Sequence, residues 1–244
     1  MPIPKNLNFK IILQNILTKL HVPTICVLCR HYHNNATAVC SWCINWLELI
    51  SNPCHHCCLP LPDPNFLICG HCIRKPPVFD RLLTKYMFVE PLRTVIHKFK
   101  YQHELYLRDF LVQLILETCD AQIKQADCVI PVPLYKSRLR QRGFNQAAEL
   151  AKALASKLGV TYIGDMCKKT INTASQVGLN ALARQINLRG AFKVQPMSCK
   201  YVIVVDDVIT TGSTVNAVAT ALKHHGVERV DVLCCARAIL HSTP

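Results

Sequence analysis

The stretch of residues 202–214 constrains the fold of this chain more than any other part of its sequence. It opens with residues 202–205, a continuous aliphatic run that is mostly β-branched. Such a run predicts a parallel β-strand covered on both faces. Apolar residues then recur with helical spacing at Val215, Val218, Ala219 and Leu222. Gly226 follows at the place of a left-handed C-cap, so the stretch predicts a strand, a loop and a helix in that order.

The loop between this strand and helix carries paired acids and then hydroxyls. Asp206 and Asp207 come first, and the helix opens on Thr210, Thr211, Gly212, Ser213 and Thr214. Unpaired N–H groups at a helix N-terminus favour an anion, and the hydroxyls beside a glycine indicate phosphate. Carboxylates repel phosphate, so the two acids would instead accept hydrogen bonds from neutral hydroxyls such as those of ribose. The loop therefore predicts a ribose 5-phosphate site; the alternative is an ordinary capped helix after a chance Asp-Asp pair.

Strands and helices alternate through most of the remaining sequence. Further strands are expected at residues 80–89, 127–132, 160–163, 187–194 and 229–236, and helices at 92–99, 104–124 and up to Leu158. This alternation predicts an α/β fold with a doubly wound parallel sheet, whose ligands bind at the carboxyl ends of its strands. Residues 167–185 lack clean periodicity, which is typical of a lid over such a site.

Two segments of this part of the chain are strongly basic. Residues 135–146 carry four cations and no acid, which favours binding of pyrophosphate or of a nucleic-acid backbone, with Tyr135 and Phe144 as stacking platforms. The alternative is a solvated basic loop. Residues 97–101 combine basic and aromatic side chains, and a solvated face with Phe99 in the core is as compatible with that pattern as a ligand role.

The formal net charge of the 244-residue chain is +13. Six cations and two acids up to Phe79 leave +4 in the first third, and two zinc ions bound by eight thiolates would cancel it. The other +9 belongs to the later part of the chain, where we therefore expect a polyanionic partner to bind.

Four Cys-x-x-Cys pairs fill the first third of the chain: Cys26/Cys29, Cys40/Cys43, Cys54/Cys57 and Cys69/Cys72. Two such pairs complete a tetrahedral zinc site, so the pattern predicts one or two closed, structural zinc ions. Disulfides and a redox role are weaker alternatives, because the chain is long, has no export features and contains an odd number of cysteines, 15. Pairing of neighbours is the simpler topology, and interleaved pairing stays open. Competing ligands for the second site are Cys58, His55, His56 and His71.

The remaining features concern the chain's organisation. Residues 5–20 predict a docking helix, and no run approaches the ~20 apolar residues that cross a bilayer, so a cytoplasmic protein without a membrane span is expected. Pro76-Pro77 marks a boundary. The expected parts are an N-terminal amphipathic helix at 1–24, a double zinc ribbon at 25–77 and an α/β domain at 78–244.

Several motifs together resemble a known family. The acid pair and Thr-Thr-Gly-x-Thr turn resemble the phosphoribosyl-pyrophosphate (PRPP) loop of type I phosphoribosyltransferases. The cysteine pairs, Pro131-Val132-Pro133-Leu134, Arg142-Gly143-Phe144-Asn145-Gln146, Gln176, Leu179, Arg184, Asn187 and Phe192 extend this to the ComF family. The resemblance spans about residues 25–238, and Cys58 departs from it where the ribbon's knuckle usually has glycine.

The resemblance implies a double zinc ribbon joined to a type I phosphoribosyltransferase-like sheet, and a role in natural transformation. Asp206 and Asp207 would bind ribose hydroxyls and stabilise an oxocarbenium-like ribose, while the turn that they precede binds the 5-phosphate. Pro133, Leu134 and Arg138 or Arg142 would face pyrophosphate, with Mg²⁺ held largely by PRPP. The implied partners are PRPP, single-stranded DNA and other competence proteins such as a DNA translocase.

Two other functions use the same site. A metabolic phosphoribosyltransferase would transfer phosphoribosyl from PRPP to a base or amine, and its excess charge would serve only phosphates and solubility. A PRPP-sensing regulator would bind duplex DNA, but no helix-turn-helix signal is present in the sequence.

Overall fold

The computed structural model describes residues 24–35, 37–171 and 190–239. The chain divides into two compact units, Met1–Trp46 and Leu47–Pro244, which are described separately below. The predicted N-terminal helix lies outside the described residues, as does the predicted lid beyond Ile171. The domain boundaries expected from the sequence remain predictions.

The first unit is small and is organised around cysteine turns. Strands β1 (Thr24–Ile25) and β2 (Tyr32–His33) pair antiparallel, and the short helix α2 (Ser41–Ile44) follows. The Sγ of Cys40 caps α2 by accepting a hydrogen bond from the N–H of Cys43. A cysteine that ends one loop therefore also starts the next element.

The second unit is built on a five-stranded, all-parallel sheet, which confirms the predicted α/β fold. Its strands are β3 (Arg81–Leu83), β4 (Cys128–Pro131), β5 (Thr161–Tyr162), β8 (Tyr201–Ile209) and β9 (Arg229–Arg237). Their order in the sheet is β3-β9-β8-β4-β5. The predicted strand at 202–205 is thus central, and all four of its residues are fully buried because helices cover both faces.

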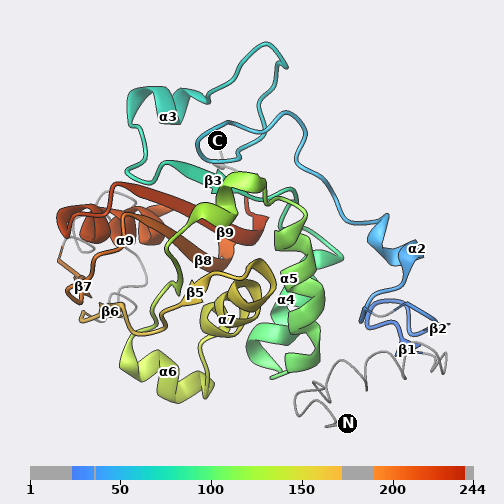
Figure 1. Cartoon of the computed structure of the whole chain (residues 1–244). Coiled ribbons are helices and arrows are strands. Elements are labelled where there is room, and N and C mark those ends of the chain that lie inside the picture. The colour runs from blue at the N-terminus through green and yellow to red at the C-terminus, as the bar shows by residue number, and fades with distance from the viewer. Residues whose placement is uncertain (1–23, 36, 172–189, 240–244) are drawn as a thin grey trace, which may run out of the picture. The chain divides into compact units, whose positions relative to one another are not determined.

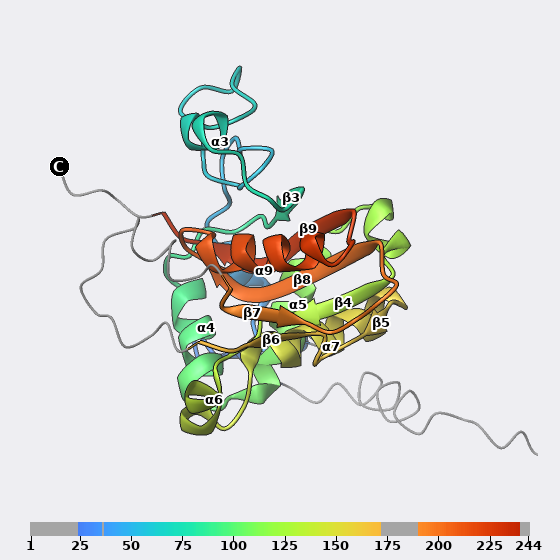
Figure 2. The same cartoon turned by 90° about the vertical axis from the view of Figure 1, so that its left-hand side faces the viewer.

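Helices pack on both faces of this sheet (Figures 1 and 2). The α-helices described in this unit are α3 (Gly70–Arg74), α4 (Leu92–Tyr101), α5 (Arg108–Leu116), α6 (Lys136–Arg142), α7 (Gln146–Leu158) and α9 (Ser213–His224). Helices α5 and α7 lie on one face and α9 lies on the other (Figure 2). An antiparallel hairpin of β6 (Cys167–Lys169) and β7 (Phe192–Val194) lies beside α9.

Three predicted elements differ from the structure. The expected strand at 80–89 is regular only over β3. The expected helix at 104–124 is broken into a 3₁₀ turn (Leu105–Leu107), α5 and a second 3₁₀ turn (Ala121–Gln125). Asp120 causes the second break, because its carboxylate accepts from the N–H groups of Gln122 and Ile123 and so starts a new turn. The basic segment is helical over α6 rather than a loop, and Gly143 ends it at a φ of 75°.

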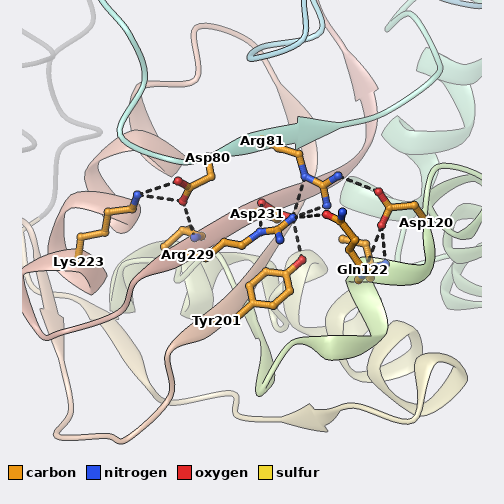
Figure 3. A network of polar contacts seen from close by, with 10 residues as sticks. Asp80, Arg81, Asp120, Gln122, Tyr201, Lys223, Arg229 and Asp231 are labelled. Carbon is orange, nitrogen blue, oxygen red and sulfur yellow. Dashed lines mark hydrogen bonds and ion pairs between the residues drawn. The ribbon is translucent and has the colours of Figure 1, made fainter.

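A network of charged side chains joins the amino ends of β3, β8 and β9 (Figure 3). The side chain of Asp231 is fully buried at the start of β9. Its Oδ2 accepts from Arg81 Nη2 at 2.7 Å, from Arg229 Nη2 at 2.9 Å and from the Tyr201 hydroxyl at 2.7 Å. The network connects the amino ends of three strands, at the end of the sheet opposite the candidate ligand site. We therefore interpret it as structural.

Candidate functional site

The two acids lie inside a strand. They were expected in a loop, but β8 continues through Asp206 and Asp207 to Ile209, because its parallel ladder with β9 continues: Asp206 pairs with Cys234 and Ile209 with Arg237. The carboxylates therefore project from rigid backbone at the carboxyl end of the central strand, where parallel sheets bind their ligands.

Asp207 is 4% exposed and is neutralised by Lys100 at the end of α4. The Lys100 Nζ lies 2.8 Å from Oδ2 and 3.2 Å from Oδ1 of this carboxylate. Burial lowers the pKa of Lys100, but the charge of Asp207 outweighs burial and raises it. Asp207 Oδ2 is buried and faces the Lys100 ammonium, so the ion pair holds this carboxylate in a fixed orientation.

Asp206 holds a proton more tightly than an ordinary carboxyl. Burial, followed by the charge of Asp207, raises the pKa of Asp206 to about 8. Its Oδ1 accepts from the backbone N–H of Asp207 at 2.9 Å. A carboxyl with a raised pKa therefore lies directly beside the Lys100–Asp207 ion pair.

The hydroxyl-rich turn follows β8 directly. Gly212 is left-handed, with a φ of 77°, and α9 begins at the next residue. Thr211 Oγ1 accepts from the N–H of Ser213 at 3.2 Å and lies 2.8 Å from Ser213 Oγ. Thr210 and Thr211 are exposed. The turn therefore presents hydroxyls and N–H groups to solvent at the N-terminus of a 12-residue helix, which is an arrangement suited to an anion.

A basic cavity of about 320 Å³ is connected to the acid pair through Lys100, which lines the cavity and pairs with Asp207. It is lined by Lys100 and Tyr101 at the end of α4, by His103 just beyond that end, and by Arg138, Gln141 and Arg142 of α6. Arg142 lies over the Tyr101 ring at 5.1 Å, and no carboxylate lines the cavity. Lys100 thus faces both the acids and two arginines that the sequence assigned to the site.

The loop after β4 begins beside the acids. The N–H of Val132 donates to the carbonyl of Val205 at 2.9 Å, so Pro133 and Leu134 leave the sheet next to Asp206. Asn145 holds this exit in place by donating to the Val132 carbonyl at 3.1 Å.

The eight cysteines gather into two groups of four: Cys26, Cys29, Cys40 and Cys43, and Cys54, Cys57, Cys69 and Cys72. This is the pairing of neighbours. The Sγ atoms of Cys29 and Cys40 lie 3.8 Å apart, and those of Cys57 and Cys69 lie 3.6 Å apart. A tetrahedron with Zn–S bonds of about 2.3 Å has edges of about 3.8 Å. Both groups could therefore hold a zinc ion.

Backbone N–H groups prepare one thiol in each group for metal binding. Burial raises the pKa of Cys26, but the N–H groups of Cys29 and Cys40 outweigh it and lower the pKa to about 6. Cys54 is similar: burial raises its pKa, and N–H groups that include those of Cys69 and Cys57 lower it to about 7. Zinc binds the thiolate, so these hydrogen bonds favour the metal-bound form.

Comparison with known proteins identifies the family. The chain is 34% identical over 223 residues to Competence protein F of Haemophilus influenzae, covering 87% of this chain and 96% of that protein. It is 33% identical over 232 residues to DNA utilization protein YhgH of Escherichia coli, covering 90% of this chain and 100% of that one. This chain belongs to the ComF family.

The fold of this ComF protein is also similar to that of phosphoribosyltransferases. Residues 144–239 match the family described as Phosphoribosyl transferase domain. Orotate phosphoribosyltransferase from Aeropyrum pernix is 16% identical with a TM-score of 0.36, over 56% of this chain and 74% of that chain. The matched residues include β8 and α9 but not α4, α6 or the cysteine groups.

Cys58 adopts the backbone that the ComF resemblance expects of glycine. Its φ is 53°, and Arg30 at the equivalent place after Cys29 has a φ of 64°. The thiol of Cys58 donates to the Leu82 carbonyl at 2.9 Å and is not part of the second sulfur group. The departure from glycine therefore leaves the four sulfurs together.

Two residues beside the site were not singled out by the sequence. Lys100 was covered only as part of the segment 97–101, for which a ligand role and a solvated face were equally compatible, and Arg237 was missed. Lys100 lies four residues after the buried Ile96, so it falls on the buried face of α4. A lysine on that face signals an acidic partner. Arg237 ends an apolar strand, and no sequence pattern marks it. Among the described residues of this ComF protein, no helix has the length and hydropathy to cross a membrane.

Proposed function

We propose that this chain binds PRPP at the acid pair and the adjoining turn, and handles single-stranded DNA during DNA uptake. The observation that carries the PRPP site is the position of Asp206 and Asp207 at the carboxyl end of β8, six and five residues before the left-handed Gly212. Relatives named for competence and DNA utilization support the DNA role.

Each part of the ligand has a chemical counterpart in this site. The Asp207 carboxylate would accept a hydrogen bond from one ribose hydroxyl, and the carboxyl of Asp206 would contact the other hydroxyl. The turn would bind the 5-phosphate through N–H groups, hydroxyls and the positive end of the α9 dipole. The strand geometry supports this arrangement, because it fixes the acids and the turn relative to each other.

Cations from α4 and α6 would bind the pyrophosphate. Lys100, Arg138 and Arg142 line one cavity beside the acids, and Pro133 and Leu134 leave the sheet at the same edge. Mg²⁺ would supply further charge as an ion bound mainly by PRPP oxygens. If transfer occurs, the bond from the anomeric carbon to pyrophosphate breaks and the acid pair stabilises the positive charge that develops on ribose.

Charge supports the DNA role. Of the net charge of +13, +9 lies after Phe79, and an excess of this size attracts a phosphate backbone. A cytoplasmic location, and contact with other competence proteins such as a DNA translocase, belong to the same proposal.

Calorimetric titration of the full chain with Mg²⁺ and PRPP tests the first half. We expect wild type to bind and Asp207→Asn to lose most of its affinity, because the amide cannot accept from the hydroxyl as a carboxylate does. Arg138→Gln should weaken the binding of PRPP. Arg140→Gln changes a residue of the same helix that does not line the cavity, and should leave the binding unchanged. Equal binding by wild type and Asp207→Asn would contradict the proposed site.

Fluorescence anisotropy with a labelled oligonucleotide tests the second half. Affinity should fall steeply between 50 and 200 mM salt, as expected when phosphate contacts dominate. Absence of binding at low salt would exclude DNA handling. Release of pyrophosphate with a base or amine acceptor, without oligonucleotide binding, would instead establish the metabolic phosphoribosyltransferase.

A further inference from the structure

Arg237 is a buried arginine held by backbone carbonyls alone among the described residues. It is the last residue of β9 and is 4% exposed. Its Nε donates to the Cys57 carbonyl at 2.9 Å, and its Nη1 donates to the Ile209 carbonyl at 3.0 Å. The same Nη1 contacts the carbonyl of Thr210 and donates to that of Ala238 at 2.8 Å. Burying a guanidinium without a carboxylate is costly, so we expect these contacts to have a specific positional role in the fold.

At one end, Arg237 fixes the entry to the phosphate turn. In a trans peptide the C=O and the following N–H point in opposite directions. With the carbonyls of Ile209 and Thr210 turned toward Arg237, the N–H groups of Thr210 and Thr211 point away from it. Successive N–H groups held in one orientation are what an anion site of main-chain donors requires.

At the other end, Arg237 holds the second cysteine group. Cys57 is one of the four sulfurs of that group, and its carbonyl accepts the Nε–H. The neighbouring backbone is bound to β3, because the N–H of Leu82 donates to the His56 carbonyl at 3.1 Å. A metal ion on the sulfurs would hold Cys57, and through it the Arg237 side chain, in this position.

We propose that Arg237 is a positioning residue through which metal binding at the second cysteine group orients the peptide planes of the phosphate turn. The inference rests on the proposed phosphate site and adds a coupling between two sites. Because such coupling is reciprocal, a bound ribose phosphate should also slow the loss of metal from the second group.

The first test compares Arg237→Lys with Arg229→Lys in the full, zinc-loaded chain. Both remove a guanidinium from β9, but Arg229 belongs to the network at the opposite end of the strand. Arg237→Lys should bind PRPP roughly tenfold more weakly, a typical coupling, and amide exchange of the 209–215 segment should be faster. Arg229→Lys should leave both unchanged. Equal behaviour of the two variants would overturn the inference.

The second test removes the metal. Cys72→Ser changes a sulfur that is not in contact with Arg237, and it should lose one zinc by elemental analysis and speed exchange of the 209–215 segment. In the Arg237→Lys background the same change should speed this exchange little further, because the hydrogen bond from Arg237 to the Cys57 carbonyl is already lost. An unchanged segment in Cys72→Ser would overturn the inference even if Arg237→Lys failed to fold. Where both single variants fold, fully additive effects in the double variant would overturn it as well.

These exchange measurements need no ligand. A wild-type chain that ignores PRPP would therefore refute the proposed function, while the coupling between the metal and the turn would still be decided.

Discussion

The Nζ of Lys100 lies 2.8 Å from Oδ2 of Asp207, which joins the end of α4 to the end of β8. Lys100 precedes residues 144–239, the part that matches the phosphoribosyl transferase domain. The charge balance of the candidate site therefore depends on a helix that the domain match does not include.

Replacing Lys100 with Met should destabilise the protein by about 1–3 kcal/mol. The substitution leaves Asp207 buried without its cation; the full cost of breaking a buried pair is reduced because the Lys100 side chain is 23% exposed. Urea denaturation measures the loss. Asp207→Asn should recover much of it in the double variant, because the uncompensated charge is then gone.

The matched control for that experiment is Lys98→Met on the same helix. Lys98 has no ion pair with a carboxylate in the described part of the chain. Its replacement should change stability by less than about 0.5 kcal/mol. A loss equal to that of Lys100→Met would mean that helix propensity, not the ion pair, accounts for the effect.

The stability of Asp206→Asn relative to wild type should increase as the pH rises. The pKa of Asp206 is raised to about 8 in the folded chain, above its ordinary value near 4. The folded state then binds more protons than the unfolded state between these values, so wild-type stability falls across that window. The Asp206→Asn variant does not lose stability in this way, because asparagine does not titrate. We expect the midpoint of thermal unfolding to exceed that of wild type by about 2–4 °C at pH 8.5 and by less at pH 5.5.

The exposed Asp165→Asn serves as the control for this pH series. It should show no pH-dependent difference from wild type. A constant gain for Asp206→Asn at every pH would refute the assignment of a raised pKa, and PRPP titration of the same variant would show whether the gain in stability is accompanied by loss of binding.

Asp231→Asn should cost about 3 kcal/mol or more in the free energy of unfolding. The change removes the fully buried carboxylate that Arg81 and Arg229 share, and leaves Arg81 with the more exposed Asp120 as its partner. Guanidinium denaturation measures the loss. Glu228→Gln is the control, since the ion pair that the Glu228 carboxylate forms with Lys200 is exposed. A cost below 1 kcal/mol would show that the network in Figure 3 contributes little.

The purified chain should contain two zinc ions. Cys29→Ser and Cys57→Ser should each lose one, since each changes a single sulfur group. Elemental analysis counts the metal, and titration with a chromogenic chelator measures its release. One zinc in wild type, retained in one of the two variants, would limit the metal to a single group.

The sequence pattern predicted elements that are determined by nearby residues, such as helix ends, and elements that are completely buried, such as the central strand. The run at 202–205 marked the central strand because aliphatic side chains suit both covered faces, and Gly226 marked the end of α9, where its φ is 88°. The helix expected at 104–124 was wrong because one carboxylate, Asp120, competes for the backbone. A helical pattern alone does not show such a competitor.

The site was predictable where its chemistry lies in one stretch. Asp206, Asp207 and the turn follow each other in the chain, so spacing was sufficient to bring them together. Lys100 and Arg237 reach the site only through the packing of α4 and the end of β9, which depends on contacts distant in sequence. For the same reason the sequence could not show that the acids stay within β8, because β9 extends the ladder.

The order of the strands in the sheet determines which fragments of the chain can fold by themselves. A fragment that began at Phe144 would lack β4, the strand between β8 and β5, and β3, which borders β9. Both sides of the β8–β9 pair would then be open edges, which recruit other chains and cause aggregation. The smallest autonomous piece must therefore start upstream of Cys54, so that the edges are covered and Arg237 retains its carbonyl partner.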